Sequence, residues 1–205
     1  TLQKVLPMFE PAVFLLFPSE GQMDAQEVRA ALSEKKSVRT LGIDGRILDP
    51  DTSFLSRMTN LDTLCIDRWD PSISGPLPSN LNNLKRLIVA ESEVRNLALL
   101  GNQPHLDELR FEGRCTLESL NEVSNFPELK ELELGPCEKI KDLSPLNQLK
   151  QLKWLGLPLT TTQQQLENIV RDHPSLIGLE LLKIEAVTDL RPLEQLRNLK
   201  FLLVW

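Results

Sequence analysis

The sequence predicts a solenoid of the α/β class, in which short parallel strands stack into one sheet and each strand is followed by a return segment on its other side. The main observation is an apolar motif, Leu-x-x-Leu-x-Leu, that recurs about every 23 residues. Apolar and polar residues alternate within each copy, as in a strand with one buried face. No Gly/Ser-rich linker or low-complexity tract divides the 205 residues. We therefore expect a single domain, residues 1–205, of about eight or nine repeats.

The copies follow one another at a nearly constant step. The clearest are Leu106/Leu109/Phe111, Leu129/Leu132/Leu134 and Leu152/Leu155/Leu157, whereas the first, Ala12/Leu15/Phe17, is degenerate. We expect the central residue of each copy to be almost fully buried; these residues are Leu15, Leu41, Leu64, Leu87, Leu109, Leu132, Leu155, Leu179 and Leu202.

Three segments between the strands carry a family resemblance. The segments Ile140-Lys-Asp-Leu-Ser-Pro-Leu-Asn-Gln-Leu-Lys-Gln-Leu152 and Val187-Thr-Asp-Leu-Arg-Pro-Leu-Glu-Gln-Leu-Arg-Asn-Leu199 are similar to internalin-type bacterial repeats. The segment Ile73-Ser-Gly-Pro-Leu-Pro-Ser-Asn-Leu81 is similar to the Gly-x-x-Pro segment of plant-type repeats. The chain thus resembles the leucine-rich repeat family over essentially its whole length. The resemblance implies a curved, right-handed horseshoe with a parallel sheet on its concave face and 3₁₀ turns or short helices on its convex face.

The chain departs from the family at the turn after each strand, where an Asn is usual. The residues at those positions are Arg46, Trp69, Ser92, Arg114, Cys137, Thr160 and Ile184. Ser92, Cys137 and Thr160 could still form hydrogen bonds within a buried turn, whereas the Ile184 side chain cannot. We therefore expect irregular turns.

Two return segments should be helical. Residues 24–33 are rich in helix formers. Residues 162–172 begin with an N-cap candidate, Thr162, and carry Leu166, Ile169 and Val170 at helical spacing. The other return segments are too short for long helices. Their apolar residues should point inward; in the two internalin-like segments these are Leu143, Leu146, Leu149, Leu190, Leu193 and Leu196.

Both ends of the array differ from its middle. Residues 12–17 and 201–205 are apolar at nearly every position, and exposed apolar edge strands promote aggregation. We expect the C-terminal strand to be covered by further protein or, through self-association, by a second molecule. Residues 1–10 resemble the convex half of an earlier repeat and could cover the other end.

The x positions of the motif should project from the concave face. The first such column contains Arg39, Asp62, Lys85, Asp107 and Lys130, whose charges alternate in sign. Opposite charges on neighbouring strands contribute roughly 0.2–1 kcal/mol per pair. We interpret this column as a structural charge ladder that favours the correct register.

The other columns predict a binding surface. Four glutamates converge on two adjacent strands beside two arginines, and Trp154 follows them with Gly156 and Gly178 leaving room around its indole. An aromatic residue beside small residues and charges is typical of a protein-binding hot spot. The candidate residues are Arg86, Glu108, Arg110, Glu112, Glu131, Glu133, Trp154 and Glu180. The alternative is a solvated acidic face on which the indole only shields the backbone.

Other functional classes find little support. An open sheet does not enclose a substrate, so the chain should not be an enzyme. His105 and His173 lack metal-ligand spacing, and we expect no metal or other cofactor. The net charge of −6 makes nucleic acid an unsuitable partner. No apolar run is long enough to insert into a membrane.

The cysteines leave one question open. Cys115 and Cys137 lie at neighbouring positions of adjacent repeats, about 4.8 Å apart if the strands align, so a disulfide is possible. The preferred interpretation is two small buried apolar residues. Cys65 should face outward without the cationic neighbour that a reactive thiol needs. The absence of Asn-x-Ser/Thr sites slightly favours a soluble, cytoplasmic location over a secreted one.

We therefore predict an interaction module that binds a protein, with a basic patch, through its concave face. Two alternatives remain. The chain could be a structural or self-assembling repeat segment of a larger protein, or the substrate-recognition half of an enzyme whose catalytic domain lies elsewhere.

Overall fold

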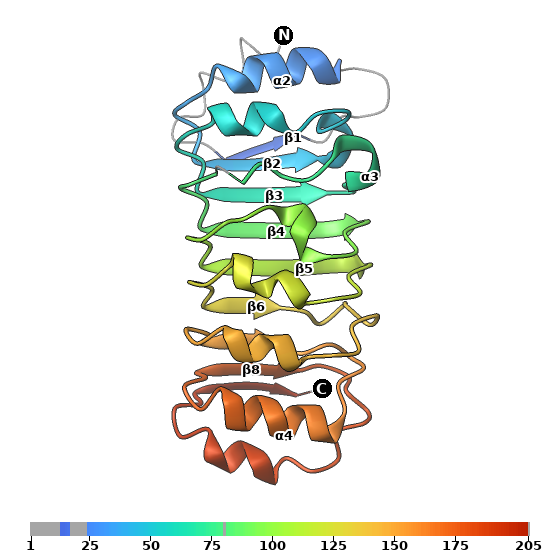
Figure 1. Cartoon of the computed structure of the whole chain (residues 1–205), viewed down its shortest axis with the longest axis vertical. Coiled ribbons are helices and arrows are strands. Elements are labelled where there is room, and N and C mark those ends of the chain that lie inside the picture. Colours follow the sequence, from blue (N-terminus) through green and yellow to red (C-terminus); the bar gives the residue numbers. More distant parts are fainter. Residues whose placement is uncertain (1–12, 17–23, 80, 205) are drawn as a thin grey trace.

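The computed structural model describes residues 13–16, 24–79 and 81–204. One unclosed sheet runs the length of the molecule, and its nine strands follow the order of the chain (Figure 1). All neighbouring strands are parallel. The strands are β1 (Val13–Leu16), β2 (Thr40–Asp44), β3 (Thr63–Asp67), β4 (Arg86–Ser92), β5 (Glu108–Cys115), β6 (Glu131–Glu133), β7 (Trp154–Gly156), β8 (Gly178–Leu181) and β9 (Phe201–Val204). The architecture is the solenoid that the repeats predict.

The predicted register is confirmed from β2 to β9. Each central leucine is paired with the next, as Leu109 is with Leu132 and Leu132 with Leu155. The seven central leucines from Leu41 to Leu179 are at most 1% exposed. They form the axis of one continuous core, because the apolar side of every strand packs against the return segments.

The two end strands depart from the prediction. In β1, Phe14 rather than Leu15 pairs with Leu41. Every residue of β1 is apolar, so no alternation of polar and apolar residues defines its register. The central residue of β9, Leu202, was expected to be buried but is 43% exposed, because no further strand packs beside it in the described chain. The expectations for residues 1–10 and for Trp205 lie outside the described residues, as does the burial of Leu15.

The return segments lie on one face of the sheet, in front of the strands in Figure 1. In the described residues they comprise three α-helices, α2 (Ala25–Ser33), α3 (Pro71–Ser74) and α4 (Gln163–Asp172), and a series of 3₁₀ helices. The 3₁₀ helices are η2 (Gly45–Ile47), η3 (Ser53–Arg57), η4 (Leu97–Leu100), η5 (Asn121–Asn125), η6 (Ser144–Gln148) and η7 (Arg191–Gln195). The expected mixture of helix types is thus present.

Side chains define the starts of the two long helices. Asp24 caps α2 by accepting a hydrogen bond from the amide of Gln26. Thr162 and Gln165 form a reciprocal capping box at the start of α4, which satisfies two amides that the helix itself leaves unpaired. Both predicted helices are therefore confirmed.

The internalin-like segments bury their leucines with one exception. Leu143, Leu146 and Leu149 are at most 4% exposed, and Leu193 and Leu196 are also buried. Leu190 was expected to point inward, but it is 40% exposed. It belongs to the last return segment, beside which the described chain has no further segment.

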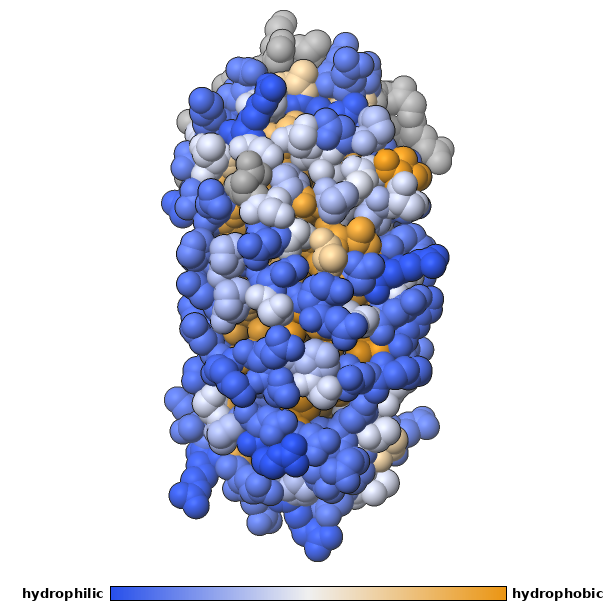
Figure 2. Space-filling view, in the orientation of Figure 1, coloured by the Kyte–Doolittle hydropathy of each residue, from blue (hydrophilic) through white to orange (hydrophobic). Residues whose placement is uncertain are grey.

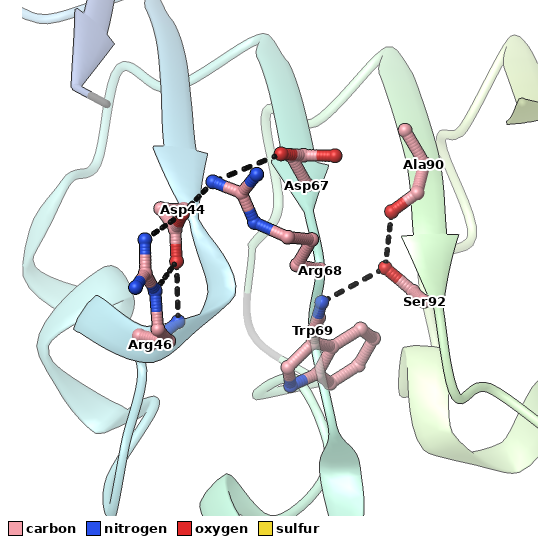
Figure 3. Close-up of polar contacts among 7 residues, drawn as sticks. All are labelled: Asp44, Arg46, Asp67, Arg68, Trp69, Ala90 and Ser92. Carbon is pink, nitrogen blue, oxygen red and sulfur yellow. Dashed lines mark hydrogen bonds and ion pairs between the residues drawn. The ribbon is translucent and has the colours of Figure 1, made fainter. Parts of the chain in front are cut away.

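Arg46 and Ser92 show how the turns form without the usual Asn. Asp44, at the end of β2, accepts hydrogen bonds from the amide and guanidinium of Arg46 and from the guanidinium of Arg68 (Figure 3). Burial alone would raise the pKa of Asp44, but the hydrogen bonds from Arg46 and Arg68 outweigh it and lower this pKa to about 2. Ser92 accepts a hydrogen bond from the amide of Trp69 at 3.0 Å and donates one to Ala90 at 2.6 Å. The role expected for Ser92 is confirmed.

The predicted irregularity of the turns is also present. The Trp69 indole fills the interior of its turn, fully buried, and its Nε1 donates to the Ser74 hydroxyl at 2.7 Å. The backbone adopts positive φ angles at Arg68 and Lys183, shortly after β3 and β8, and at Glu91, near the end of β4. Large side chains and residues with a left-handed backbone conformation thus form these turns, in place of one Asn at the same position of each turn.

Cys115 and Cys137 form a disulfide, so the preferred expectation of two unpaired cysteines was wrong. Their Cα atoms lie 4.9 Å apart, close to one strand spacing. The strand β5 extends to Cys115 through Gly113, whose φ of 62° suits glycine, and this extension brings the sulfur to the turn after β6. The sequence predicted the distance between the two cysteines, but it did not predict the path of the backbone that brings their sulfurs together.

The surface formed by the return segments is mainly hydrophilic, with small apolar patches between the segments (Figure 2). Among the described residues, no helix is both long and apolar enough to cross a membrane.

Candidate functional site

The sheet face opposite the return segments, which we call the open face, carries all the predicted binding residues. The strand register sorts them into rows that cross the strands. The middle row contains Arg86, Glu108, Glu131, Trp154, Gly178 and Phe201. The next row contains Arg110, Glu133, Gly156, Glu180 and Leu203. Side chains in one row are neighbours at about 4.8 Å per strand, so each row is a continuous line of contacts.

Two arginines neutralise Glu108 in the central part of the open face. The carboxylate of Glu108 accepts hydrogen bonds from Nε of Arg86 and Nε of Arg110. Nη2 of Arg110 also lies 3.5 Å from Oε2 of Glu131. Glu108 is only 8% exposed, so little of its carboxylate is open to a partner. Glu108 therefore holds the side chains of Arg86 and Arg110 in place on the open face.

The side chain of Glu133, on β6, extends over the neighbouring strand β7. Its carboxylate fills the space above Gly156, where a methyl group would overlap it, and it accepts a hydrogen bond from the Gly135 amide at 2.8 Å. Burial and the negative charge of Glu180 raise the pKa of Glu133 to about 6, although the Gly135 amide opposes the shift. The glycine in β7 thus permits a partly desolvated carboxylate on the open face.

Trp154 repeats this arrangement one strand further along. Its six-membered ring lies over Gly178 of β8, where a methyl group would overlap it. Beyond the glycine, the ring reaches Phe201 of β9, with centroids 5.8 Å apart and planes tilted by 41°. The expected space around the indole is confirmed at Gly178, whereas Glu133 occupies the space above Gly156.

Glu112 and Glu180 complete the predicted set. Glu112 is exposed and Glu180 is half-buried. Within the described part of the chain, neither Glu112, Glu133 nor Glu180 belongs to an ion pair. The carboxylates of Glu133 and Glu180, on β6 and β8, therefore have no cationic partner of the kind that neutralises Glu108.

The expected charge ladder is present in part at the edge of the open face; among the described residues, Lys85 in its middle forms no ion pair. Arg39 pairs with Asp62 at 2.9 Å, and Lys130 pairs with Asp107 at 2.7 Å. Beside the ladder lies an open depression of about 460 Å³, which the sequence did not predict. Its lining residues are Asp62, Thr63, Lys85, Arg86, Asp107, Glu108, Lys130 and Glu131. Charges of both signs line it, so it favours no single charge on a ligand.

The remaining chemically active groups do not form a further site. Burial raises the pKa of the Cys65 thiol, which reduces its thiolate fraction. Burial lowers the pKa of His173, and His105 lies 3.2 Å from the Glu128 carboxylate. In the described residues, no group of three or more His, Cys, Asp or Glu side chains is arranged to hold a metal ion.

Phe201 is the main binding candidate that the sequence did not single out. It is 55% exposed and contacts Trp154 across Gly178. The three residues share one predicted row, so a search for aromatic residues on either side of a glycine would have found the pair. The buried role of Asp44 gave no comparable signal, because Asp67 occupies the same position in the next strand and is partly exposed.

Structural comparison identifies proteins with the same architecture. Internalin C2 of Listeria monocytogenes superposes with a TM-score of 0.51 at 17% identity, over 86% of this chain and 84% of that one. Mouse RP105, in its complex with MD-1, gives a TM-score of 0.60 at 20% identity, over 85% of this chain and 31% of the matched chain. A leucine-rich repeat protein of Leptospira interrogans gives 0.51 at 20% identity, over 92% and 58% of the two chains.

Sequence comparison finds neither a matching family model nor a matching curated protein. The repeat spacing, the single parallel sheet with return segments on one face and these structural matches agree. The chain has the leucine-rich repeat fold.

Proposed function

We propose that residues 1–205 act as one protein-interaction domain that binds a partner protein through the open face. The observation that carries this proposal is the contact between Trp154 and the exposed Phe201, beside carboxylates without ion pairs. Aromatic residues in such settings dominate the binding energy of protein interfaces. A complementary partner has a basic patch and an apolar anchor, and the unbalanced negative charge should speed its association at low salt.

The fold comparison supports a binding role in general terms. One structural match, RP105, is a member of a protein complex with MD-1. We propose no catalytic role, since the carboxylates lie on an open sheet that does not enclose a substrate. The disulfide between Cys115 and Cys137 argues against the cytoplasmic location that the sequence slightly favoured, because disulfides persist mainly in oxidising compartments.

Photo-crosslinking tests the proposal directly. A photoreactive phenylalanine analogue is placed at Lys153, an exposed residue next to Trp154 whose replacement leaves the proposed binding residues unchanged, or, as a control, at Glu194 on the return-segment face. We expect the first position, and not the second, to capture a native partner. Changing Glu131 and Glu180 together to Lys should abolish this capture, whereas the matched change of Glu185 and Glu194 should not.

A folded Glu131→Lys/Glu180→Lys variant that still captures its partner would contradict the proposal. Capture only from Glu194 would also contradict it, because the partner would then bind the return segments.

A second candidate function is assembly through β9. Phe201, Leu202 and Val204 are 55%, 43% and 50% exposed, and the outer edge of β9 pairs with no strand in the described chain. Such an edge can accept a further strand. Sedimentation over a range of concentrations tests for self-association. If Leu202→Lys makes an associating chain monomeric, β9 is the contact; an unchanged oligomer excludes it.

A further inference from the structure

Gly156 brings two carboxylates toward each other on the open face. In the row of Glu133, Gly156 and Glu180, the glycine occupies the middle strand. Glu133 leans over this glycine, so its carboxylate approaches the side of Glu180. The negative charge of Glu180 is also one of the causes that raise the pKa of Glu133. A side chain at position 156 would separate them.

Gly178 brings together two aromatic rings in the adjacent row. Trp154 leans over Gly178 and contacts Phe201 on the following strand. Trp154 and Gly156 are two residues apart on β7, so they face the same side about 7 Å apart along the strand. The aromatic pair and the carboxylate pair therefore lie side by side.

An arginine side chain matches both pairs. Its aliphatic stem and planar guanidinium pack on aromatic faces, and its fixed donors suit carboxylate oxygens. The spacing between the two pairs is comparable to the length of such a side chain. The positive charge of arginine also matches this site, because neither Glu133 nor Glu180 belongs to an ion pair within the described chain.

We propose that Trp154, Phe201, Glu133 and Glu180 form one docking site for an arginine side chain of the partner protein. This inference rests on the proposed function and assigns it a recognition chemistry. The stem lies against the two rings, and the guanidinium lies between the two carboxylates.

Protonation of Glu133 regulates this site. The groups that act on Glu133 are Arg110 and Glu112 from β5, Glu180 from β8 and the Gly135 amide in its own turn. A bound guanidinium stabilises the ionised form of Glu133, so binding below about pH 6 must release a proton. Affinity therefore rises as the pH rises through this range.

An NMR titration of the whole chain with a short peptide tests the site. The probe is the acetylated and amidated peptide Gly-Ser-Leu-Arg-Leu-Ser-Gly, and its control contains citrulline, a neutral analogue of similar shape, in place of arginine. We expect the arginine peptide to shift the amides of Gly156 and Gly178 and the indole of Trp154. The citrulline peptide should bind roughly two- to fivefold more weakly, as expected for the loss of a partly exposed ion pair.

Two further comparisons give the contribution of the carboxylates. Glu180→Gln should weaken binding of the arginine peptide by a similar factor, whereas Glu194→Gln on the return-segment face should leave it unchanged. Binding to the native chain should also be weaker at pH 5 than at pH 7.5. Amide spectra of each variant establish that the sheet is intact.

Equal affinity for the two peptides overturns the inference, as does the absence of shifts at Gly156 and Gly178. Shifts confined to the depression beside the charge ladder overturn it too. Such results leave the proposed function standing if crosslinking from Lys153 still captures a partner. Failure of crosslinking, by contrast, rejects the open-face function whatever the peptides do.

Discussion

The two halves of the open face use glutamate in opposite ways. In the half around β4 and β5, the carboxylate of Glu108 is enclosed by the guanidinium groups of Arg86 and Arg110. In the half formed by β6–β9, Glu133 has no ion pair and lies over a glycine instead. The same residue type therefore stabilises one half and leaves charge available for a partner in the other. Each glutamate has an arginine beside it on the preceding strand, Arg86 for Glu108 and Arg110 for Glu133. Arg110 turns to Glu108 and Glu131 instead, and Glu133 lies over Gly156 on the following strand.

The largest expected effect is the difference in lost stability between a leucine in the core of the array and one at its C-terminal edge. Leu132 is 1% exposed and Leu202 is 43% exposed, although both are central residues of their repeats. Leu132→Ala should lower the free energy of unfolding by roughly 2–5 kcal/mol, as for other core leucines. Leu202→Ala should cost clearly less, because half-exposed atoms lose less burial. Equal losses in denaturant titrations would show that β9 is covered in solution.

The disulfide joins the turns where the two halves meet. Its cysteines are separated by 22 residues in sequence, and closing a loop of this length stabilises a folded protein by about 3 kcal/mol in the chain-entropy model. Cys115→Ser/Cys137→Ser should therefore lower the free energy of unfolding by about this amount. Cys65→Ser serves as the matched control and should have a small effect. If the double variant is as stable as the native chain, the disulfide does not form in solution.

Neutralising one glutamate in each half should change stability in opposite directions. Glu108→Gln removes the negative charge and one of the two oxygens that accept from Arg86 and Arg110, so it should destabilise the chain by about 1–3 kcal/mol at pH 7.5. Glu133→Gln should instead stabilise it by about 1 kcal/mol at this pH, since burial disfavours the Glu133 carboxylate and an amide oxygen can still accept from Gly135.

The sign of the Glu133 effect depends on pH. The folded-state pKa of about 6 lies above the ordinary value of 4.5, so the protonated group stabilises the fold fully below pH 4.5. This contribution is lost as the pH rises through 6. The stability difference between Glu133→Gln and the native chain should accordingly disappear near pH 4.5 in parallel denaturant titrations. A constant difference across this range would contradict the assignment.

The sequence predicted the fold well where apolar and polar residues alternate. From β2 to β9 a slip of one residue would expose the core leucines, so the repeat fixes the register. In β1 every residue is apolar, and the sequence could not distinguish Phe14 from Leu15 as the central residue. The disulfide was named as possible but was not the preferred interpretation, because it depends on the bulged course of β5 near Gly113, which the repeat period does not encode.

For the candidate site, the sequence predicted which residues share a row but not how their side chains are oriented. The register placed Glu108, Glu133 and Trp154 correctly, but not the direction in which each side chain lies. Glu108 turns toward the arginines and Glu133 toward Gly156. These directions depend on contacts between strands more than 20 residues apart in sequence. A glycine within a row is the sequence signal for such leaning side chains.

A substitution of Gly178 tests this role of glycine. Gly178→Ala places a methyl group where the Trp154 ring lies, so the ring must move away from Phe201. We expect a shift of the tryptophan fluorescence and a loss of stability of about 1–3 kcal/mol or less, as in other overpacked sites. Gly75→Ala provides a control for a glycine with no neighbouring side chain in contact, although its own φ of 77° adds backbone strain. Unchanged Trp154 fluorescence in Gly178→Ala would mean that the ring does not cover the glycine.

The most direct test of the contrast between the two halves is the pKa of Glu133 itself. Carbon-detected NMR of the side-chain carboxyl group, followed from pH 3 to pH 8, measures it in the native chain. We predict a midpoint near 6 that falls toward the ordinary value when Glu180 is changed to Gln, because the negative charge beside Glu133 is then removed. A midpoint at or below 4.5 would show that Glu133 is solvated or paired like Glu108 and would contradict the account.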